Sequence, residues 1–137
     1  MNDYLPRTKT FKSKNMIDPN ELQNELKNFY GSETRYQYTF LWVKLYYSEG
    51  CHFLFQKSES FWLINLIASW QDEILDTDKD FQVWELKQME SKSWVITCTD
   101  GNMRILCKQE IEYSDFPITS GFKIWVVDRM LMLPSEY

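Results

Sequence analysis

The segment Arg35–Tyr47 constrains the fold more than any other part of the chain. It consists mainly of Tyr, Phe, Trp, Val, Leu and Thr, which favour strands, and no polar stripe with helical spacing interrupts it. One side of such a strand presents Tyr36, Tyr38, Phe40, Trp42, Lys44 and Tyr46, and the other presents Gln37, Thr39, Leu41, Val43, Leu45 and Tyr47. Because both sides are apolar near the middle, we expect one long strand that is central in its sheet or wrapped.

Two segments predict helices. Asp18 is suited to cap a helix whose first position is Pro19, and Gly31 favours a left-handed exit, so a short amphipathic helix is expected between them. Apolar residues recur with helical spacing over Phe61–Leu75 and also fill the adjacent face. This second segment predicts one long helix that is buried nearly all round.

The rest of the chain indicates strands joined by short links. Ser48-Glu49-Gly50 predicts a tight turn that leads into a hairpin partner at 51–55, and Asp100-Gly101 predicts a second hairpin. The expected later strands are 81–89, 94–98, 103–113, 122–127 and 130–133. We therefore predict an α+β fold: a mostly antiparallel β-sheet meander packed against one long buried helix. Residues 1–17 are expected to be a polar basic arm, and residues 18–137 a single domain.

Charge and cysteine content limit the classes of partner. The formal net charge is −5, so nucleic acid is expected only through the arm, whose basic residues are Arg7, Lys9, Lys12 and Lys14. Three cysteines without a CxxC pair favour neither a disulfide framework nor a zinc site. We expect a cytoplasmic protein with no cofactor, no structural metal and no membrane span.

Candidate catalytic residues are few. His52 is the one histidine of the sequence, and Glu110, Glu112 and Asp115 form a carboxylate cluster that could hold Mg²⁺ in a nuclease or phosphodiesterase. Solvated charges at a sheet edge explain the same carboxylates. The run Asp76, Asp78, Asp80 is spaced like part of a calcium loop, but it lacks the glycine and the closing glutamate of that motif.

Aromatic residues give the candidate binding site. The chain has six Trp, eight Tyr and nine Phe, more than one helix-on-sheet core readily covers. Tyr36, Tyr38 and Trp42 are therefore candidates for a surface patch, although a core explains their stripe better than a base-stacking platform does. At the C-terminus, Glu136 and Tyr137 together present negative charge beside an aromatic ring, which suits an Arg on a partner. The alternative is that Tyr137 packs as a latch on its own core.

Several segments taken together resemble an uncharacterised family of small bacterial proteins, a domain of unknown function with members in cyanobacteria and other bacteria. The resemblance spans roughly residues 25–137 and rests on Phe29-Tyr30-Gly31-Ser32-Glu33, Tyr47-Ser48-Glu49-Gly50, the stretch 61–71, the stretch 109–117 and the closing Met132-Leu133-Pro134-Ser135-Glu136-Tyr137. It implies one intact domain and carries no assigned reaction, ligand or functional residue.

These observations favour a non-enzymatic interaction module with an aromatic and acidic surface. We expect a protein partner or self-association, in a bacterial or mobile-element setting of defence or counter-defence. Two alternatives stay open: the metal-dependent nuclease or phosphodiesterase described above, and a sponge that sequesters a nucleotide second messenger by stacking its base on Trp or Tyr.

Overall fold

The fold was examined in a computed structural model that describes residues 17–31 and 33–137. Of the predicted basic arm, all but Ile17 lies outside the described residues. The helices are α1 (Pro19–Leu26), α2 (Glu49–Lys57) and α3 (Trp62–Ser69). The strands are β1 (Arg35–Phe40), β2 (Val43–Ser48), β3 (Phe81–Gln88), β4 (Trp94–Thr99), β5 (Ile105–Ile111), β6 (Phe122–Val127) and β7 (Met130–Met132).

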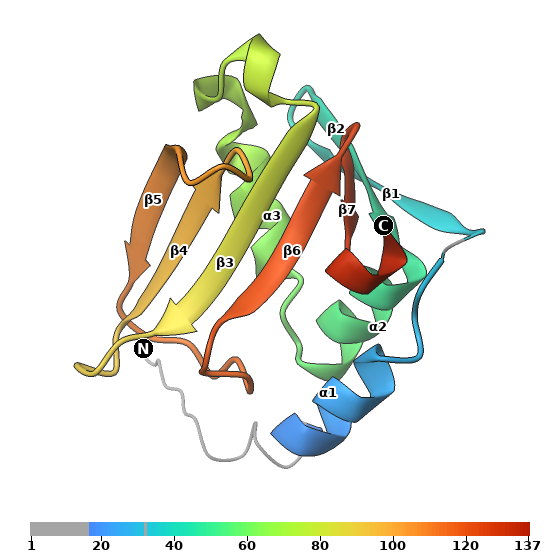
Figure 1. Cartoon of the computed structure of the whole chain (residues 1–137), viewed down its shortest axis with the longest axis vertical. Helices are drawn as coiled ribbons and strands as arrows, with labels where there is room; N and C mark the ends of the chain where they lie inside the picture. Colours follow the sequence, from blue (N-terminus) through green and yellow to red (C-terminus); the bar gives the residue numbers. More distant parts are fainter. Residues whose placement is uncertain (1–16, 32) are drawn as a thin grey trace.

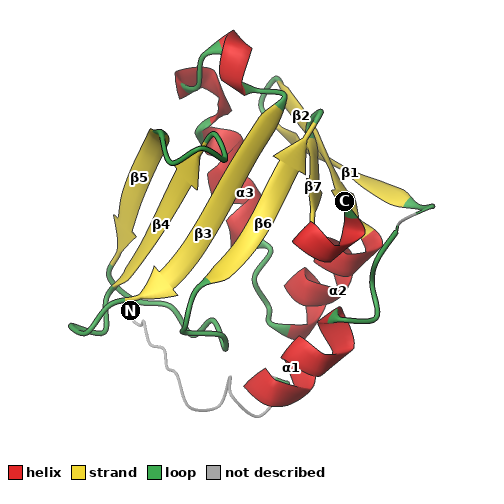
Figure 2. Cartoon of the chain, viewed as in Figure 1, coloured by secondary structure: helices red, strands yellow, loops and turns green. Residues whose placement is uncertain are grey.

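The strands form a mixed, mostly antiparallel sheet with the order β1-β2-β7-β6-β3-β4-β5. Only β2 and β7 pair in parallel. The α-helices lie on one face of this sheet, as Figures 1 and 2 show. We call that face the inner face and the opposite one the outer face. The α+β class and the mostly antiparallel pairing agree with the sequence prediction, but the sheet is not a simple meander because β7 inserts between β2 and β6.

The core fills the space between the inner face and the helices. Its large buried side chains include Trp84, Trp94 and Phe55, together with leucines and isoleucines from α1, α2 and α3. A buried pair of glutamines joins the two layers: Gln71 and Gln82 exchange amide hydrogen bonds of 3.1 and 3.0 Å, and Trp84 Nε1 donates to Gln82 Oε1 at 2.9 Å. The amides are therefore satisfied, as burial requires.

The prediction of one long strand over 35–47 is wrong. The chain reverses at Leu41 and Trp42, and β1 pairs with β2 as an antiparallel hairpin. The reversal shifts the alternation by one residue, so Tyr36, Tyr38 and Phe40 share the inner face with Val43, Leu45 and Tyr47. A hairpin thus explains why apolar residues occur at both even-numbered and odd-numbered positions of the segment.

The predicted hairpin partner at 51–55 is also wrong, because these residues lie in α2. Ser48 caps this helix: its side-chain oxygen accepts from the Cys51 backbone N–H at 3.1 Å. Gly50 does not form a turn. A Cβ at position 50 would lie 2.7 Å from Glu136 Oε1, so a larger residue here would displace the Glu136 side chain that approaches from the C-terminal segment.

The single long helix predicted over 61–75 is shorter and less buried than expected. α3 ends at Ser69 and is followed by two 3₁₀ turns at Gln71–Glu73 and Asp76–Asp78. Its buried residues, Leu63, Ile64, Ile67 and Ala68, form one face only. The side chain of Gln71 donates to the Ile67 carbonyl at 3.1 Å, which satisfies a helix-terminal oxygen and turns the chain toward Gln82.

Candidate interaction surface

The aromatic residues predicted as a binding stripe are divided between two places. Tyr36 and Tyr38 lie half-buried on the inner face, and the Tyr38 hydroxyl donates to Asn65 Oδ1 of α3 at 2.6 Å. Tyr36 stacks on the His52 ring with centroids 4.1 Å apart and planes 12° apart. These two tyrosines therefore contact the helical layer.

Trp42 lies apart from the two tyrosines, at the tip of the β1–β2 hairpin. Leu41 and Trp42 are 69% and 75% exposed at a tip where Gly, Asn or Asp is usual. Leu41 has a φ of 54°, a region that leucine rarely adopts. Trp42 Nε1 donates to Asp72 Oδ1 at 3.2 Å, which holds the indole against the turn after α3.

Glu136 and Tyr137 have different roles, although they were predicted as one site. The Glu136 carboxylate accepts hydrogen bonds from the Ser48 hydroxyl at 2.6 Å and from the backbone N–H groups of Gly50 at 3.0 Å and Leu133 at 2.9 Å. It is thus engaged within the chain. The Tyr137 ring is 75% exposed and packs edge-on to Trp125 and Phe81.

The outer face carries two apolar rows that sequence reasoning missed. The first row follows paired residues across four strands and consists of Tyr46, Met130, Val127 and Phe81. The second consists of Met132, Trp125, Val83 and Thr99. Thr99 is the one polar member. We call these eight residues the outer rows; no α-helix of the described residues covers them (Figure 1).

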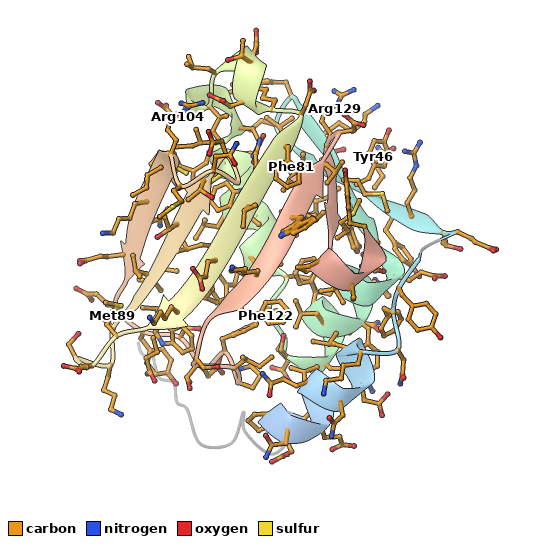
Figure 3. The ribbon with its side chains drawn as sticks, viewed as in Figure 1. Tyr46, Phe81, Met89, Arg104, Phe122 and Arg129 are labelled. Atoms are coloured by element: carbon orange, nitrogen blue, oxygen red, sulfur yellow. The ribbon has the colours of Figure 1, made fainter. Side chains whose placement is uncertain are left out.

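Aromatic rings dominate the outer rows. The Trp125 ring lies 5.3 Å from Phe81 and 5.3 Å from Tyr137, both edge-on. The Arg35 guanidinium stacks over Tyr46 at 4.1 Å. Figure 3 labels Tyr46, Phe81 and Arg129 at the same upper end of the sheet, and the Arg129 carbonyl accepts from the Tyr46 backbone N–H. The face therefore combines aromatic and cationic groups.

Charge is distributed unequally around the sheet. The outward positions of the strands hold five basic residues and two acidic ones: Arg35, Lys44, Lys87, Lys108 and Lys123, with Glu85 and Glu110. By contrast, residues 17–137 hold 11 basic and 19 acidic residues in total. The outer face is locally basic on an acidic protein. The acidic surface expected from the sequence lies elsewhere, on the helices and loops.

The carboxylates of the nuclease hypothesis do not meet His52. His52 lies on α2 beneath β1 and β2, where it stacks on Tyr36 and Tyr47. Glu110 lies on β5, the opposite edge of the sheet, and Glu112 and Asp115 follow β5. Six strand spacings of about 4.8 Å separate β1 from β5, roughly 29 Å in all. The structure therefore does not bring these four residues together.

Two residues of the aspartate run after α3, Asp76 and Asp78, also form ion pairs within the chain. Asp76 pairs with Lys79 at 3.2 Å, and the buried Asp78 pairs with Arg104. Arg104 bonds Asp100 as well, and the backbone N–H groups of Asn102 and Arg104 lower the Asp100 pKa. Across residues 17–31 and 33–137, no group of three or more His, Cys, Asp or Glu side chains is placed to hold a metal ion.

The cysteines form an arrangement that their sequence separation does not suggest. Cys98 and Cys107 lie directly opposite each other on β4 and β5, and both are free thiols. Hydrogen bonding between them raises the pKa of Cys98 and lowers that of Cys107. Cys51 is fully buried in α2, and desolvation raises its pKa.

One groove of about 730 Å³ lies between α1 and the start of β6. Leu26 and Phe122 contribute apolar surface, and Lys27 and Lys123 contribute charge. None of the residues predicted as a site lines it. It adjoins the outer face through Lys123.

An α+β domain with an aromatic, locally basic outer sheet face is thus the class that the structure defines. A family model described as a family of unknown function (DUF6876) matches residues 20–137, and the chain belongs to that family. The resemblance noted from the sequence agrees with this. Comparison with curated proteins and with solved structures gives no match. In the described residues, no helix has the length and hydropathy to span a membrane.

Proposed function

We propose that the protein is a non-enzymatic binding module that docks its partner on the outer face of the sheet. One observation carries the proposal: seven of the eight residues in the outer rows are apolar, and each row is in register across four neighbouring strands. Apolar patches that are contiguous and rimmed by polar residues mark interaction sites. Here the rim consists of Arg35, Lys44, Lys123 and Glu85.

The position of Tyr137 supports the same surface. The C-terminal 3₁₀ turn (Pro134–Glu136) is fixed by the three hydrogen bonds of Glu136, and it delivers the exposed Tyr137 ring beside Trp125. Exposed aromatic rings held in place lose little entropy on binding and often act as anchors. The residue predicted as a partner contact thus belongs to the outer face, and Glu136 positions it.

The cellular setting remains part of the proposal. Three free cysteines are consistent with a reducing compartment, so we place the module in the cytoplasm. Following the family resemblance, we place it in a bacterium or its mobile elements, where a role in defence or counter-defence fits a small accessory protein.

A capture experiment with matched variants tests the proposal. The immobilised protein is exposed to extract of the host, and the retained proteins, nucleic acids and small molecules are quantified. Val83→Glu adds a charge in the middle of the outer rows, and Gln56→Glu adds the same charge on the exposed side of α2. Material that the wild type and Gln56→Glu retain and Val83→Glu loses supports the outer face. Equal retention by both variants contradicts it.

A further inference from the structure

We infer that the outer face binds single-stranded nucleic acid. This inference rests on the proposed function, because it names the class of partner for the same surface. The residue pattern alone does not predict it, because the aromatic stripe seen in the sequence has Lys44 as its only basic residue and lies mainly on the inner face. The hairpin at Leu41 and Trp42 changes which residues share a face.

The aromatic side chains occupy positions suited to stacking bases. Tyr46 and Phe81 stand at the two ends of the first outer row, three strand spacings or about 14 Å apart. Trp125 and the exposed Tyr137 lie beside Phe81. Sheets that present aromatic rings in this way bind unpaired bases of varied sequence, because every base has a π-face.

Lys44 and Lys108 are the basic side chains best placed for phosphate, whereas Lys123 faces Glu85 on the neighbouring strand. Within the described part of the chain, the basic side chains found in ion pairs are Lys79 and Arg104, and neither occupies an outward position on a strand. Lys44 and Lys108 each face a threonine on the neighbouring strand, Thr39 and Thr97. Their ammonium groups therefore have no carboxylate directly opposite that competes with a phosphate.

The net negative charge of the protein does not prevent a phosphate from binding to the outer face. Many acidic residues lie on the helices, which cover the opposite face of the sheet, whereas Asp80 and Asp128 flank Phe81 and Val127 at one end of the first outer row. The screening length at physiological ionic strength is about 8 Å, so a phosphate bound away from that end responds chiefly to the five basic residues and two acidic ones at outward strand positions.

Other occupants fit the same face less well. Lysine is depleted in protein–protein interfaces, whereas four lysines stand on these strands. A second copy packed face to face would oppose two surfaces that both carry a positive excess. Duplex nucleic acid keeps its bases stacked and offers no ring to the aromatics. A single strand supplies both phosphates and free bases.

Fluorescence anisotropy with the full chain tests the inference. The probes are labelled 12-nucleotide RNA and DNA of mixed sequence, single-stranded or annealed to their complements. With about three phosphate contacts, raising salt from about 50 to 200 mM weakens single-strand binding about 20-fold. The annealed probes are expected to bind more weakly than the single strands.

Two matched pairs of variants locate the binding. Lys44→Glu with Lys108→Glu is expected to abolish it. Lys27→Glu with Lys57→Glu, the same charge change at the C-terminal ends of α1 and α2, is expected to keep the wild-type affinity. Tyr137→Ala is expected to weaken it about 10-fold, and Tyr30→Ala, which removes a ring that is 77% exposed outside the sheet, is expected to leave it unchanged.

Three results would overturn the inference. They are no binding of either single strand at low salt, an equal loss of affinity in an outer-face variant and its matched control, and duplex probes bound as tightly as single strands. Its failure is separable from that of the proposed function. If the capture experiment recovers an acidic protein through the outer face while the oligonucleotides do not bind, the module stands and its nucleic-acid partner is rejected.

Discussion

The Glu136 carboxylate accepts a hydrogen bond of 2.6 Å from the Ser48 hydroxyl, which lies 88 positions earlier in the chain. Ser48 also caps α2, and Glu136 receives the Gly50 backbone N–H at 3.0 Å, so one carboxylate joins the end of the chain to the start of a helix. A negative group at a helix N-terminus is favourable in itself. The contact fixes the turn from which Tyr137 reaches the outer face.

Glu136→Ala is therefore expected to lower the free energy of unfolding by about 2–3 kcal/mol, because it leaves a buried hydroxyl and two backbone N–H groups without their acceptor. Chemical denaturation measures the change. Glu112→Ala, at an exposed position, serves as the control and is expected to change stability by less than about 0.5 kcal/mol. Equal effects of the two substitutions would show that the hydrogen bonds of Glu136 do not stabilise the fold.

Gln82→Leu tests the buried amide pair. The substitution leaves Gln71 and the Trp84 indole N–H without their partner in a fully buried site, and we expect a loss of about 2–4 kcal/mol. Adding Gln71→Leu removes one of the two polar groups that Gln82→Leu leaves without a partner. The double variant is therefore expected to lose less stability than the sum of the losses in the two single variants. Additive losses in a double-mutant cycle would contradict a direct amide pair.

Alkaline pH is expected to destabilise the protein through Cys51. Burial raises the pKa of this thiol in the folded state, whereas the unfolded thiol releases its proton from about pH 8.5. The unfolded state therefore holds fewer protons above that pH, and stability falls by about 1.4 kcal/mol per pH unit. Below pH 8 the contribution is constant.

Cys51→Ala removes this titration and is expected to make the decline between pH 8.5 and about 10 less steep, measured by urea unfolding at each pH. The decline that remains is expected from Cys98, whose pKa is also raised in the folded state. Above pH 10 the decline becomes steeper in both proteins, because desolvation also raises the pKa of Tyr47. An unchanged slope in Cys51→Ala would show that another group carries the pH dependence.

Mild oxidation is expected to join Cys98 to Cys107. Directly opposite residues on antiparallel strands have Cα atoms about 4.5–5.5 Å apart, within the range that a disulfide spans. Oxidised glutathione should yield a monomer lighter by two hydrogen atoms. Cys51 should remain a free thiol that an alkylating reagent labels after unfolding. Peptide mapping that places Cys51 in the bridge would contradict the pairing of β4 with β5.

The sequence predicted the regular parts of the fold well. The Asp18 cap and the strand 122–127 are found where the residue patterns placed them. Local chemistry determines each of these: a side-chain oxygen that accepts from Asn20 and Glu21, and strict alternation along a strand. Such signals need no information about the rest of the chain.

The errors have tertiary causes. Nothing local indicates a turn at Leu41 and Trp42, because a large apolar side chain at positive φ is unfavourable by itself. Gly50 was interpreted as a turn glycine, although it is small because Glu136 approaches it from the far end of the chain. The candidate site differs from the predicted one for the same reason. The hairpin puts Tyr36 and Tyr46 on opposite faces of the sheet. The outer rows depend on strand pairings that cannot be read from the sequence.

Site-specific photo-crosslinking at Phe81 tests the central claim most directly. Benzoylphenylalanine replaces Phe81 in the outer rows or, as the control, Phe61, which is 40% exposed on the helical side of the molecule. The host cells are irradiated, and adducts are resolved by mass. We predict adducts from position 81 that position 61 does not give. Adducts from position 61 alone, or equal adducts from both positions, would contradict a partner docked on the outer face of the sheet.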